Sequence, residues 1–284
     1  MRSRIVWVGV GVALAILVLS APAARGAVVG YQATAETSGD GFSKLYSIDV
    51  TTGVRGLIGS TGVQCLRALD SSPHDGFLYG LGYGSVAGTS LFRIDTATGS
   101  ATEVVTGVAP GGFVVNNLAF APNGIAYASV GWLYDDPVNL DLLKIDVLNK
   151  TVTHLGSLSP VYDQMRALAI DAAGNGIGWD ADSNSLFTVD LNTAATTHLG
   201  DLNLRFEAFD YGPDGTLYGW SIWDEIYAID PASATATLMP GLTNTPHSIG
   251  SLAIAFPPVP EPTSLLVWLL LGVLGIAVGW RPRR

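Results

Sequence analysis

Oxygen-bearing side chains alternate in one short segment of the chain, residues 180–184, which reads Asp-Ala-Asp-Ser-Asn. Carboxylate and amide oxygens at every second position are the way in which calcium-binding loops begin. The glycine that normally follows is absent, and Leu191 stands at the twelfth position, where such loops have a bidentate Glu. We therefore predict no resident metal and no other cofactor. Asp180, Asp182 and Asn184 are the one calcium candidate, and a solvated turn is the favoured alternative.

The sequence carries none of the short patterns that organise catalysis. No His-Glu-x-x-His, Cys-x-x-Cys, Gly-x-Ser-x-Gly or Walker sequence occurs. His154 and His198 stand in identical Thr-His-Leu-Gly contexts, so we interpret them as repeat positions on outer strands and not as a catalytic pair. We predict that the protein is not an enzyme.

The remaining candidates for chemistry stand at the starts of similar apolar segments. Three of the eight Arg and Lys residues between positions 27 and 256 occur there, with an amide and a carboxylate beside them. The set is Arg67, Asn116, Arg166, Arg205 and Glu207. In a strongly acidic domain, such a concentration of arginines fits the binding of an anionic group or of sugar hydroxyls. The alternative is that the arginines pair with the local aspartates across the channel.

These candidates belong to a repeated pattern, which predicts the elements that position them. Five segments share the order apolar, aromatic or apolar, any residue, Ile or Val, Asp, and each continues into a polar turn and a further strand-like segment. Their aspartates are Asp49, Asp95, Asp146, Asp190 and Asp230, at intervals of 46, 51, 44 and 40 residues. One copy per repeat favours hydrogen bonding in turns or at strand ends over a role in a site.

A second unit lies between successive aspartates and consists of an apolar segment, a turn and another apolar segment. Its turns are Asp75-Gly76, Asn123-Gly124, Asn175-Gly176 and Asp214-Gly215. These dipeptides supply the positive backbone angles of tight hairpins, and the alternating residues beside them supply strands. Each repeat is therefore two hairpins, and about 45 residues per four strands is the period of a β-propeller blade.

The ends of the repeat region set the number of blades. The segment after position 27 matches a second strand, and residues 251–256 match a first strand that stops at two prolines. Supplying that strand to the first blade closes a ring and removes exposed sheet edges. The sequence thus predicts an all-β domain over 27–256, a five-bladed propeller with four antiparallel strands per blade; six or seven blades with degenerate members are the alternative. The repeats resemble those of secreted bacterial propellers of the YVTN-like or quinoprotein-like kind, which implies a fold and no activity.

The charge of this domain limits its partners. It holds 23 acidic and 8 basic residues, a net charge of about −15. Nucleic acid or an anionic membrane surface would need a basic face, so neither is expected as a partner, whereas a neutral polysaccharide or a cation suits this charge. The single cysteine, Cys65, leaves no internal disulfide, so packing must stabilise the fold.

The N-terminus predicts export. Arg2 and Arg4 precede an apolar run and a stretch of small residues, the order of a signal peptide. We place signal peptidase cleavage after Gly26, with Ala23 as the second choice, so that residues 1–26 form the signal peptide.

The C-terminus predicts a membrane anchor. Residues 257–263 form a Pro-rich linker, and residues 264–284 hold an apolar run and a basic tail. Leu265 to Trp280 would rise about 24 Å as a helix, and interfacial Trp and Arg side chains make up the distance needed to span a membrane. The membrane stop is Arg281, Arg283 and Arg284, which holds the C-terminus in the cytoplasm and the preceding domain outside it.

The order of Pro260-Glu261-Pro262, apolar segment and basic end resembles the PEP-CTERM sorting signal of exported proteins in Gram-negative bacteria. The same C-terminal motif is also called an ice-binding protein C-terminal motif, a name that describes sorting and implies no contact with ice. The resemblance covers only the last 25 residues but includes all three parts. It implies that an exosortase recognises Pro260, Glu261 and Pro262. It also implies anchoring in the inner membrane facing the periplasm, followed by transfer to the cell surface or extracellular matrix.

Together these features predict a transiently anchored surface or exopolysaccharide-matrix protein whose propeller is a binding module, with an exopolysaccharide as a candidate partner. A purely structural matrix component is a further alternative, and so is a hydrolase or lyase acting on extracellular polysaccharide. Such an enzyme needs two carboxylates about 5 to 10 Å apart in the central pocket. Only Glu207 is expected at the channel mouth, because Asp70, Asp171 and Asp210 are predicted at the far ends of their strands, near turns.

Overall fold

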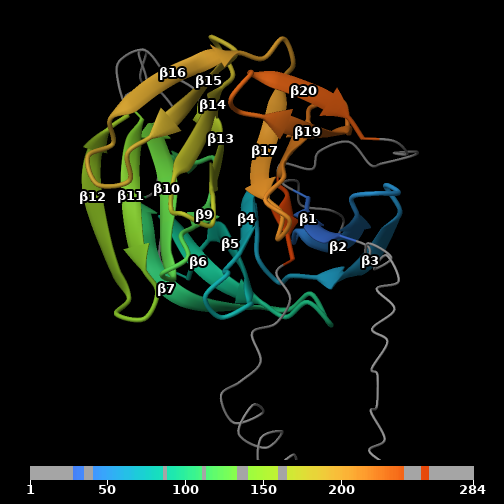
Figure 1. Cartoon of the computed structure of the whole chain (residues 1–284). Helices are drawn as coiled ribbons and strands as arrows, with labels where there is room; N and C mark the ends of the chain where they lie inside the picture. The colour runs from blue at the N-terminus through green and yellow to red at the C-terminus, as the bar shows by residue number, and fades with distance from the viewer. Residues whose placement is uncertain are drawn as a thin grey trace, which may run out of the picture.

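The computed structural model describes residues 28–34, 41–85, 88–110, 113–132, 140–158, 165–239 and 251–255. Five antiparallel sheets surround a central axis, each radiating outward from one innermost strand (Figure 1). The innermost strands of neighbouring sheets contact each other all the way round. The predicted five-bladed β-propeller with four antiparallel strands per blade is therefore confirmed. Within the described ranges, no helix has the length and apolar character needed to cross a membrane.

The blades are numbered in chain order. Blade 1 contains β21 (Ala253–Ile254), β1 (Val29–Ala33), β2 (Lys44–Asp49) and β3 (Arg55–Ser60). Blade 2 contains β4 (Ala68–Ser71), β5 (Leu78–Tyr83), β6 (Gly88–Ile94) and β7 (Ala101–Pro110). Blade 3 contains β8 (Phe113–Val115), β9 (Ala119–Phe120), β10 (Ile125–Trp132), β11 (Asp141–Asp146) and β12 (Thr151–Ser157). Blade 4 contains β13 (Met165–Ile170), β14 (Gly176–Asp180), β15 (Ser185–Val189) and β16 (Thr196–Asp201). Blade 5 contains β17 (Phe206–Tyr211), β18 (Leu217–Ser221), β19 (Ile226–Asp230) and β20 (Thr235–Leu238).

In three blades the hairpin turn lies at the predicted dipeptide. Gly76, Gly124 and Gly215 have φ of 74°, 82° and 79°, a backbone conformation that favours glycine. Blade 4 differs from the prediction. Its positive φ of 87° falls at Gly174, while Gly176 is the first residue of β14. The turn is therefore at Asp171–Gly174, because the Asp171 carbonyl accepts the Gly174 amide, and the Asn175-Gly176 dipeptide leads into the next strand.

Apolar side chains fill the spaces between blades. One hydrophobic cluster lies in each interface between adjacent sheets, and the innermost strands contribute to every one of them. The interface between blades 4 and 5 is rich in aromatic rings: Phe206 packs edge-on against Trp179, Phe209 and Tyr227 at centroid distances of 5.1 to 5.7 Å. Trp179 and Phe206 are fully buried. The outer strands β12, β16 and β20 contain only exposed and half-buried residues, as expected for an edge that faces solvent.

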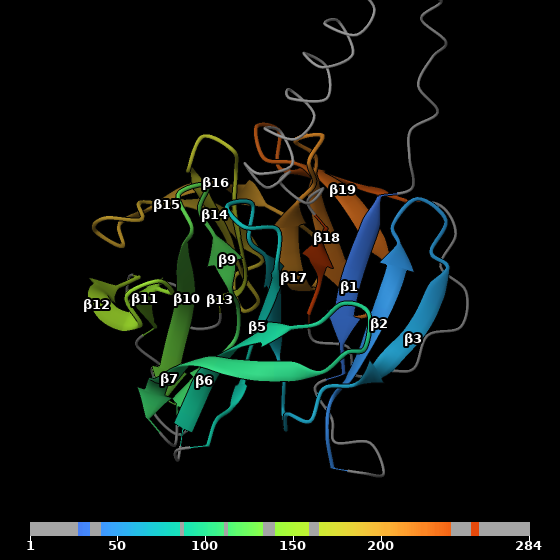
Figure 2. The ribbon, with the colours of Figure 1, turned by 90° about the horizontal axis from the view of Figure 1, so that it is seen from below.

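The ring closes between blade 5 and blade 1. The closing strand β21 pairs with β1 through Gly30 with Ile254 and Tyr31 with Ala253, and it also contacts β17. In Figure 2 the red closing strand lies between β1 and the orange strands of blade 5. Closure by a strand from the C-terminal end is thus confirmed, with β21 spanning two of the predicted residues 251–256. Farther out in the same interface, the Arg55 guanidinium of β3 lies 4.5 Å from the ring centre of Trp220.

Several predictions fall on residues outside the described ranges. These are the signal peptide over 1–26, the linker over 257–263 with its sorting motif, and the anchor over 264–284. They stay predictions.

Candidate binding site at the channel mouth

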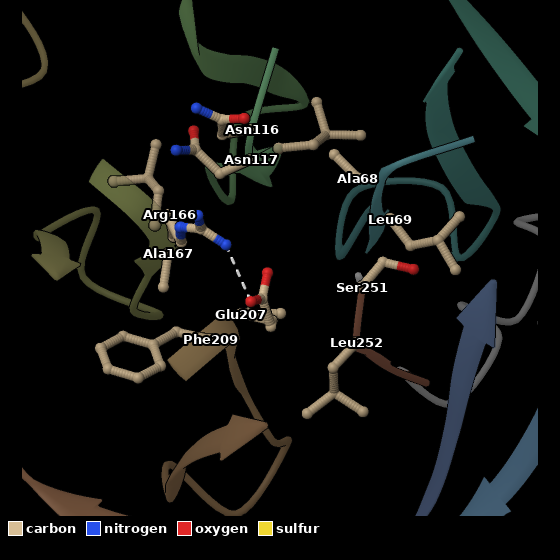
Figure 3. A pocket seen from close by; sticks show the side chains of 13 residues that line it. Ala68, Leu69, Asn116, Asn117, Arg166, Ala167, Glu207, Phe209, Ser251 and Leu252 are labelled. Atoms are coloured by element: carbon tan, nitrogen blue, oxygen red, sulfur yellow. Dashed lines mark hydrogen bonds and ion pairs between the residues drawn. The ribbon is translucent and has the colours of Figure 1, made fainter. Parts of the chain in front are cut away.

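The central channel opens into a shallow pocket at the end where the innermost strands begin. The pocket has a volume of about 210 Å³, part of it open to solvent. All five blades contribute to its lining: Ala68, Leu69, Asn116, Asn117, Leu118, Arg166, Ala167, Leu168, Glu207, Ala208, Phe209, Ser251 and Leu252. Figure 3 shows polar groups from blades 1, 3, 4 and 5 around an apolar wall.

Three of the five predicted residues meet in this pocket. Arg166 of blade 4 donates from Nη1 to Glu207 Oε1 of blade 5 at 2.8 Å, and Asn116 of blade 3 lies on the same rim (Figure 3). Arg166 and Glu207 lie at β-bulges, between Met165 and Ala167 in β13 and between Phe206 and Ala208 in β17. A bulge re-aims a side chain. Arg166 is therefore an ion-pair partner, as in the alternative interpretation, but its partner is a glutamate and not an aspartate.

Arg67 and Arg205 lie outside the pocket lining. Both are exposed at the starts of β4 and β17, on the same end of the propeller as the pocket. Their backbones are fixed by pairing, because the Arg67 amide donates to the Leu81 carbonyl and the Arg205 carbonyl accepts the Ile222 amide. Two exposed arginines therefore lie on the same end of the propeller as the Arg166–Glu207 ion pair.

Two other polar residues of the lining are structural. The Asn117 side chain is 5% exposed; its amide donates to Ser129 Oγ and to the Met165 carbonyl, and its oxygen accepts the Ser129 amide. Asn117 thereby joins blade 3 to blade 4 where the innermost strand of blade 3 is interrupted between β8 and β9. Ser251 accepts the Ala33 amide through Oγ and fixes the closing segment to β1. These side chains shape the pocket and are already hydrogen-bonded.

Two exposed aromatic residues lie on the same end of the propeller. Tyr83, at the end of β5, is 53% exposed, and its amide donates to Gln64 next to the start of blade 2. Trp223, in the turn after β18, is 56% exposed and follows Ile222, which bonds to Arg205. Sequence reasoning missed both residues. The available signal was an aromatic residue at the end of the second strand of blade 2 and another in the turn that follows the second strand of blade 5.

A pair of buried aspartates lies deeper along the axis. Each innermost strand has one equivalent position that pairs with a residue of the second strand. In blades 1 to 5 this position is held by Ala253, Asp70, Ala119, Ala169 and Asp210. Their partners on the second strands are, in the same order, Tyr31, Tyr79, Tyr127, Ile177 and Tyr218. Asp70 and Asp210 are 5% and 6% exposed. Alanine in the other three blades leaves room on the axis for these two side chains, which hydrogen-bond to each other across it.

Backbone amides of the neighbouring blades also bond to this pair. Asp70 accepts the Ser71 amide of its own strand and the Phe120 amide of blade 3. Asp210 accepts the Ile254 amide of blade 1 and the Tyr211 amide of its own strand. Burial raises the pKa of Asp70 from about 3.8 to about 7. Burial, together with the charge of Asp70, also raises the pKa of Asp210 well above its ordinary value. A proton shared by the two carboxyls therefore lets Asp210 donate to Asp70.

This pair does not have the geometry of a glycosidase. Retaining enzymes hold their carboxyl groups about 5 to 5.5 Å apart and inverting enzymes farther apart, with substrate between them. Asp70 and Asp210 bond directly to each other and are absent from the pocket lining. The prediction that they sit near turns at the far ends of their strands missed that they face the axis. Asp171 does occupy the expected turn position, where its oxygens accept the amides of Ala173 and Asn175.

The aspartates repeated once per blade are turn residues, as predicted. Each caps the turn after its strand by accepting a backbone amide two or three residues ahead. The amide donors are Thr51 for Asp49, Ala97 for Asp95, Asn149 for Asp146, Asn192 for Asp190 and Ala232 for Asp230. These hydrogen bonds, with the Thr51 hydroxyl the largest contributor at Asp49 and the Ser233 hydroxyl at Asp230, lower the pKa of all five carboxyls.

The two histidines are repeat positions on outer strands, as predicted. His154 on β12 lies 2.7 Å from Asp141, and His198 on β16 lies 2.9 Å from Asp201, each at an exposed edge. In the calcium candidate, Asp180 is fully buried and its Oδ2 accepts the amide and hydroxyl of Ser183. Among the described residues, no group of three or more His, Cys, Asp or Glu side chains is placed to hold a metal ion.

No family model and no curated protein matches this chain. Solved structures match it in fold. A chain of a nidogen/laminin complex is 11% identical over 81% of this chain and 100% of its own, with a TM-score of 0.50. TolB from Acinetobacter baumannii is 11% identical over 80% of this chain and 66% of its own, with a TM-score of 0.48. A calcium-binding protein, regucalcin, from Agrobacterium tumefaciens is 16% identical over 74% and 73%, with a TM-score of 0.47. At these identities the likeness concerns the fold alone.

Proposed function

We propose that this chain is an exported surface or exopolysaccharide-matrix protein whose propeller binds a polysaccharide at the channel mouth. The observation that carries the proposal is the contrast between the mouth and the rest of the repeat. The turn aspartates recur in every blade, whereas the rim presents Arg67, Asn116, Arg166 and Glu207 on four successive blades. Residues that break a repeat on one face mark the face where a specific partner binds.

The chemistry of this face fits a saccharide. A shallow pocket with an amide and an Arg–Glu pair offers donors and acceptors for hydroxyl groups. Tyr83 and Trp223 add apolar ring faces on which a sugar ring can lie, and their polar tips remain hydrated. The strongly negative domain repels other polyanions, and the exposed Arg67 and Arg205 attract only a locally placed anionic group. A neutral or sparsely acidic chain therefore fits best.

The tail supplies the second part of the proposal. Pro260, Glu261 and Pro262 would be recognised by an exosortase after signal peptidase removes residues 1–26. The basic end at Arg281, Arg283 and Arg284 would hold the propeller on the periplasmic side of the inner membrane until then. This part rests on the sequence and on its resemblance to the PEP-CTERM signal.

Binding is tested with neutral and acidic oligosaccharides and the full chain in detergent, by isothermal calorimetry. Arg166→Ala and Trp223→Ala should each weaken binding at least fivefold. The matched controls are Lys144→Ala, a cation on the third strand of blade 3, and Leu148→Ala, a side chain 90% exposed in a turn of the same blade. Equal affinity in all four variants, or no binding by the wild type, would refute the saccharide site.

Sorting is tested separately by intact mass of the exported protein. Loss of the C-terminal segment from Pro262 onward would support the role of the tail. Glu261→Ala, or deletion of the exosortase, should prevent this loss. An intact tail in an outer-surface fraction would contradict it.

A further inference from the structure

The closing strand β21 is held in the ring by few hydrogen bonds. It pairs with β1 over only two residues, and the adjoining Ala255 amide donates to the Val29 carbonyl. On its other flank, toward blade 5, the Ile254 amide donates to Asp210. The innermost strands of blades 2, 4 and 5, which are β4, β13 and β17, are four to six residues long. Asp210 is therefore a principal polar contact between the last blade and the strand that closes the circle.

Asp70 completes this connection across the axis. It bonds to Asp210 and to the Phe120 amide of β9, the other two-residue innermost strand. The two carboxyl groups thus form a continuous hydrogen-bonded chain from β21 to β9. Blades 2 and 5, which carry the aspartates, are not neighbours, since blade 1 lies between them. The pair ties the two shortest innermost strands to two of the longer ones.

This arrangement needs one proton between the two carboxyl groups. Two ionised carboxylates in direct contact repel each other strongly in a buried site, whereas one proton lets one group donate to the other. Four backbone amides already point at the pair, from Ser71, Phe120, Tyr211 and Ile254. They stabilise one negative charge. They leave the remaining lone pairs directed between the two groups, where a proton fits.

Among the residues that the structure describes, no other charged side chain acts on the pair in place of that proton. On β4, β9 and β21 the pair has no other titratable neighbour, and β1, β5, β17 and β18 contribute phenols. These phenols are Tyr31, Tyr79, Tyr83, Tyr211 and Tyr218, and burial raises the pKa of Tyr79 and Tyr211 above the ordinary value. On β13 and β17, Arg166 and Glu207 pair with each other at the mouth. Arg55 lies farther out in the same interface, against Trp220.

We infer that Asp70 and Asp210 form a proton-dependent latch on the closing strand: with a shared proton they hold β21 in the ring, and its loss releases β21 toward solvent. β21 is the last strand before Pro260-Glu261-Pro262 in the sequence. Release would add the residues of β21 to the chain segment that separates the ring from this motif. The acidity of the compartment would then regulate how far the motif extends from the propeller.

The latch is tested by hydrogen exchange of the full chain in detergent, followed by mass spectrometry between pH 5 and pH 9. After correction for intrinsic exchange, peptides covering 251–255 should exchange at least tenfold faster at pH 8.5 than at pH 5. Peptides covering β14 (Gly176–Asp180) should change less than twofold, which distinguishes strand release from global unfolding. An unchanged corrected rate at 251–255 overturns the proposal, and so does equal acceleration in both regions.

Two variants sharpen the test. Asp210→Asn keeps an oxygen for the Ile254 amide and supplies a permanent donor to Asp70, so exchange at 251–255 should lose its pH dependence. Asp171→Asn, which removes a turn carboxylate on the chain just after β13, should keep the wild-type behaviour. Protection restored at pH 8.5 by added calcium, and abolished by a chelator, would assign the pair to a cation and overturn the latch. The wild-type pH series decides the matter if Asp210→Asn fails to fold.

Discussion

The aspartates that follow the third strands and the aspartates that face the axis differ in exposure, hydrogen bonding and charge. Asp95 stands for the first group: it is exposed, and amides of the next turn lower its pKa. Asp210 stands for the second: it is buried, its pKa is raised by burial, and it bonds across two blades. The first kind occurs in all five blades, and the second in two. The same side chain therefore stabilises a local turn as an anion and closes the ring as an acid.

This difference distinguishes interactions that form within a single repeat from interactions that form only when the ring is assembled. A turn aspartate acts within four residues of its own position, so each blade can carry one independently. An axial aspartate acts only when other blades bring their amides to it. Two acids with three alanines fill the axis, whereas five acids would set like charges side by side. The axial aspartates therefore stabilise the closure of the ring and not the fold of a single blade.

The largest expected effect is on the stability of the ring after Asp210→Ala. The Ile254 and Tyr211 amides would be left buried without an acceptor, at about 1 to 3 kcal/mol each, so we expect a loss of about 2 to 6 kcal/mol. Urea unfolding followed by the fluorescence of the buried Trp179 and Trp220 measures it. Asp210→Asn is the control, with a loss less than half as large. An alanine variant as stable as the wild type would mean that these amides do not depend on Asp210.

The next effect is the pH dependence of stability, in which the two groups have opposite signs. The pKa of Asp70 rises from about 3.8 to about 7 on folding, so the folded state binds more protons and stability falls as pH rises from about 4 through 7. The pKa values of the turn aspartates fall on folding, so their contribution is lost below pH 4. The melting temperature should therefore peak in mildly acid solution. Asp210→Asn should flatten the alkaline side of this profile and leave the acid side unchanged; a wild-type maximum at pH 8 would contradict the assignment.

The sequence predicted the blade and the number of blades because both are local. The turn glycines, the strand alternation and the aspartate spacing each act within one repeat, and the unpaired segment at 251–256 showed where the ring closes. The position of the turn in blade 4 was missed because Gly174 and Gly176 both fit a hairpin signal. Only the pairing of Ala169 with Ile177 shows which one is used.

The candidate site was predicted in part, for a related reason. Arg166, Asn116 and Glu207 were placed at the mouth from the strand starts alone, and the structure brings them together. Asp70, Asp171 and Asp210 look alike in sequence, since each follows a short apolar segment before a turn. Two face the axis and one caps a turn because Asp171 lies two residues beyond Ala169, which is the position that matches Asp70 and Asp210 in cross-strand pairing. An aspartate where three repeats have alanine was the signal that could have separated them.

The smallest expected effect is at the turns. In Asp95→Ala the Ala97 amide loses its acceptor but remains accessible to water, which can replace the bond. The loss in unfolding free energy should be several-fold smaller than that of Asp210→Ala, and similar when the change is made at Asp190 in another blade. Asp95→Asn, which keeps the oxygen and removes the charge, separates hydrogen bonding from electrostatics. The same urea titration measures all of these variants. A loss at Asp95 as large as that at Asp210 would remove the distinction between the two groups, because it would mean that a turn within one blade matters to the ring as much as the contact that closes it.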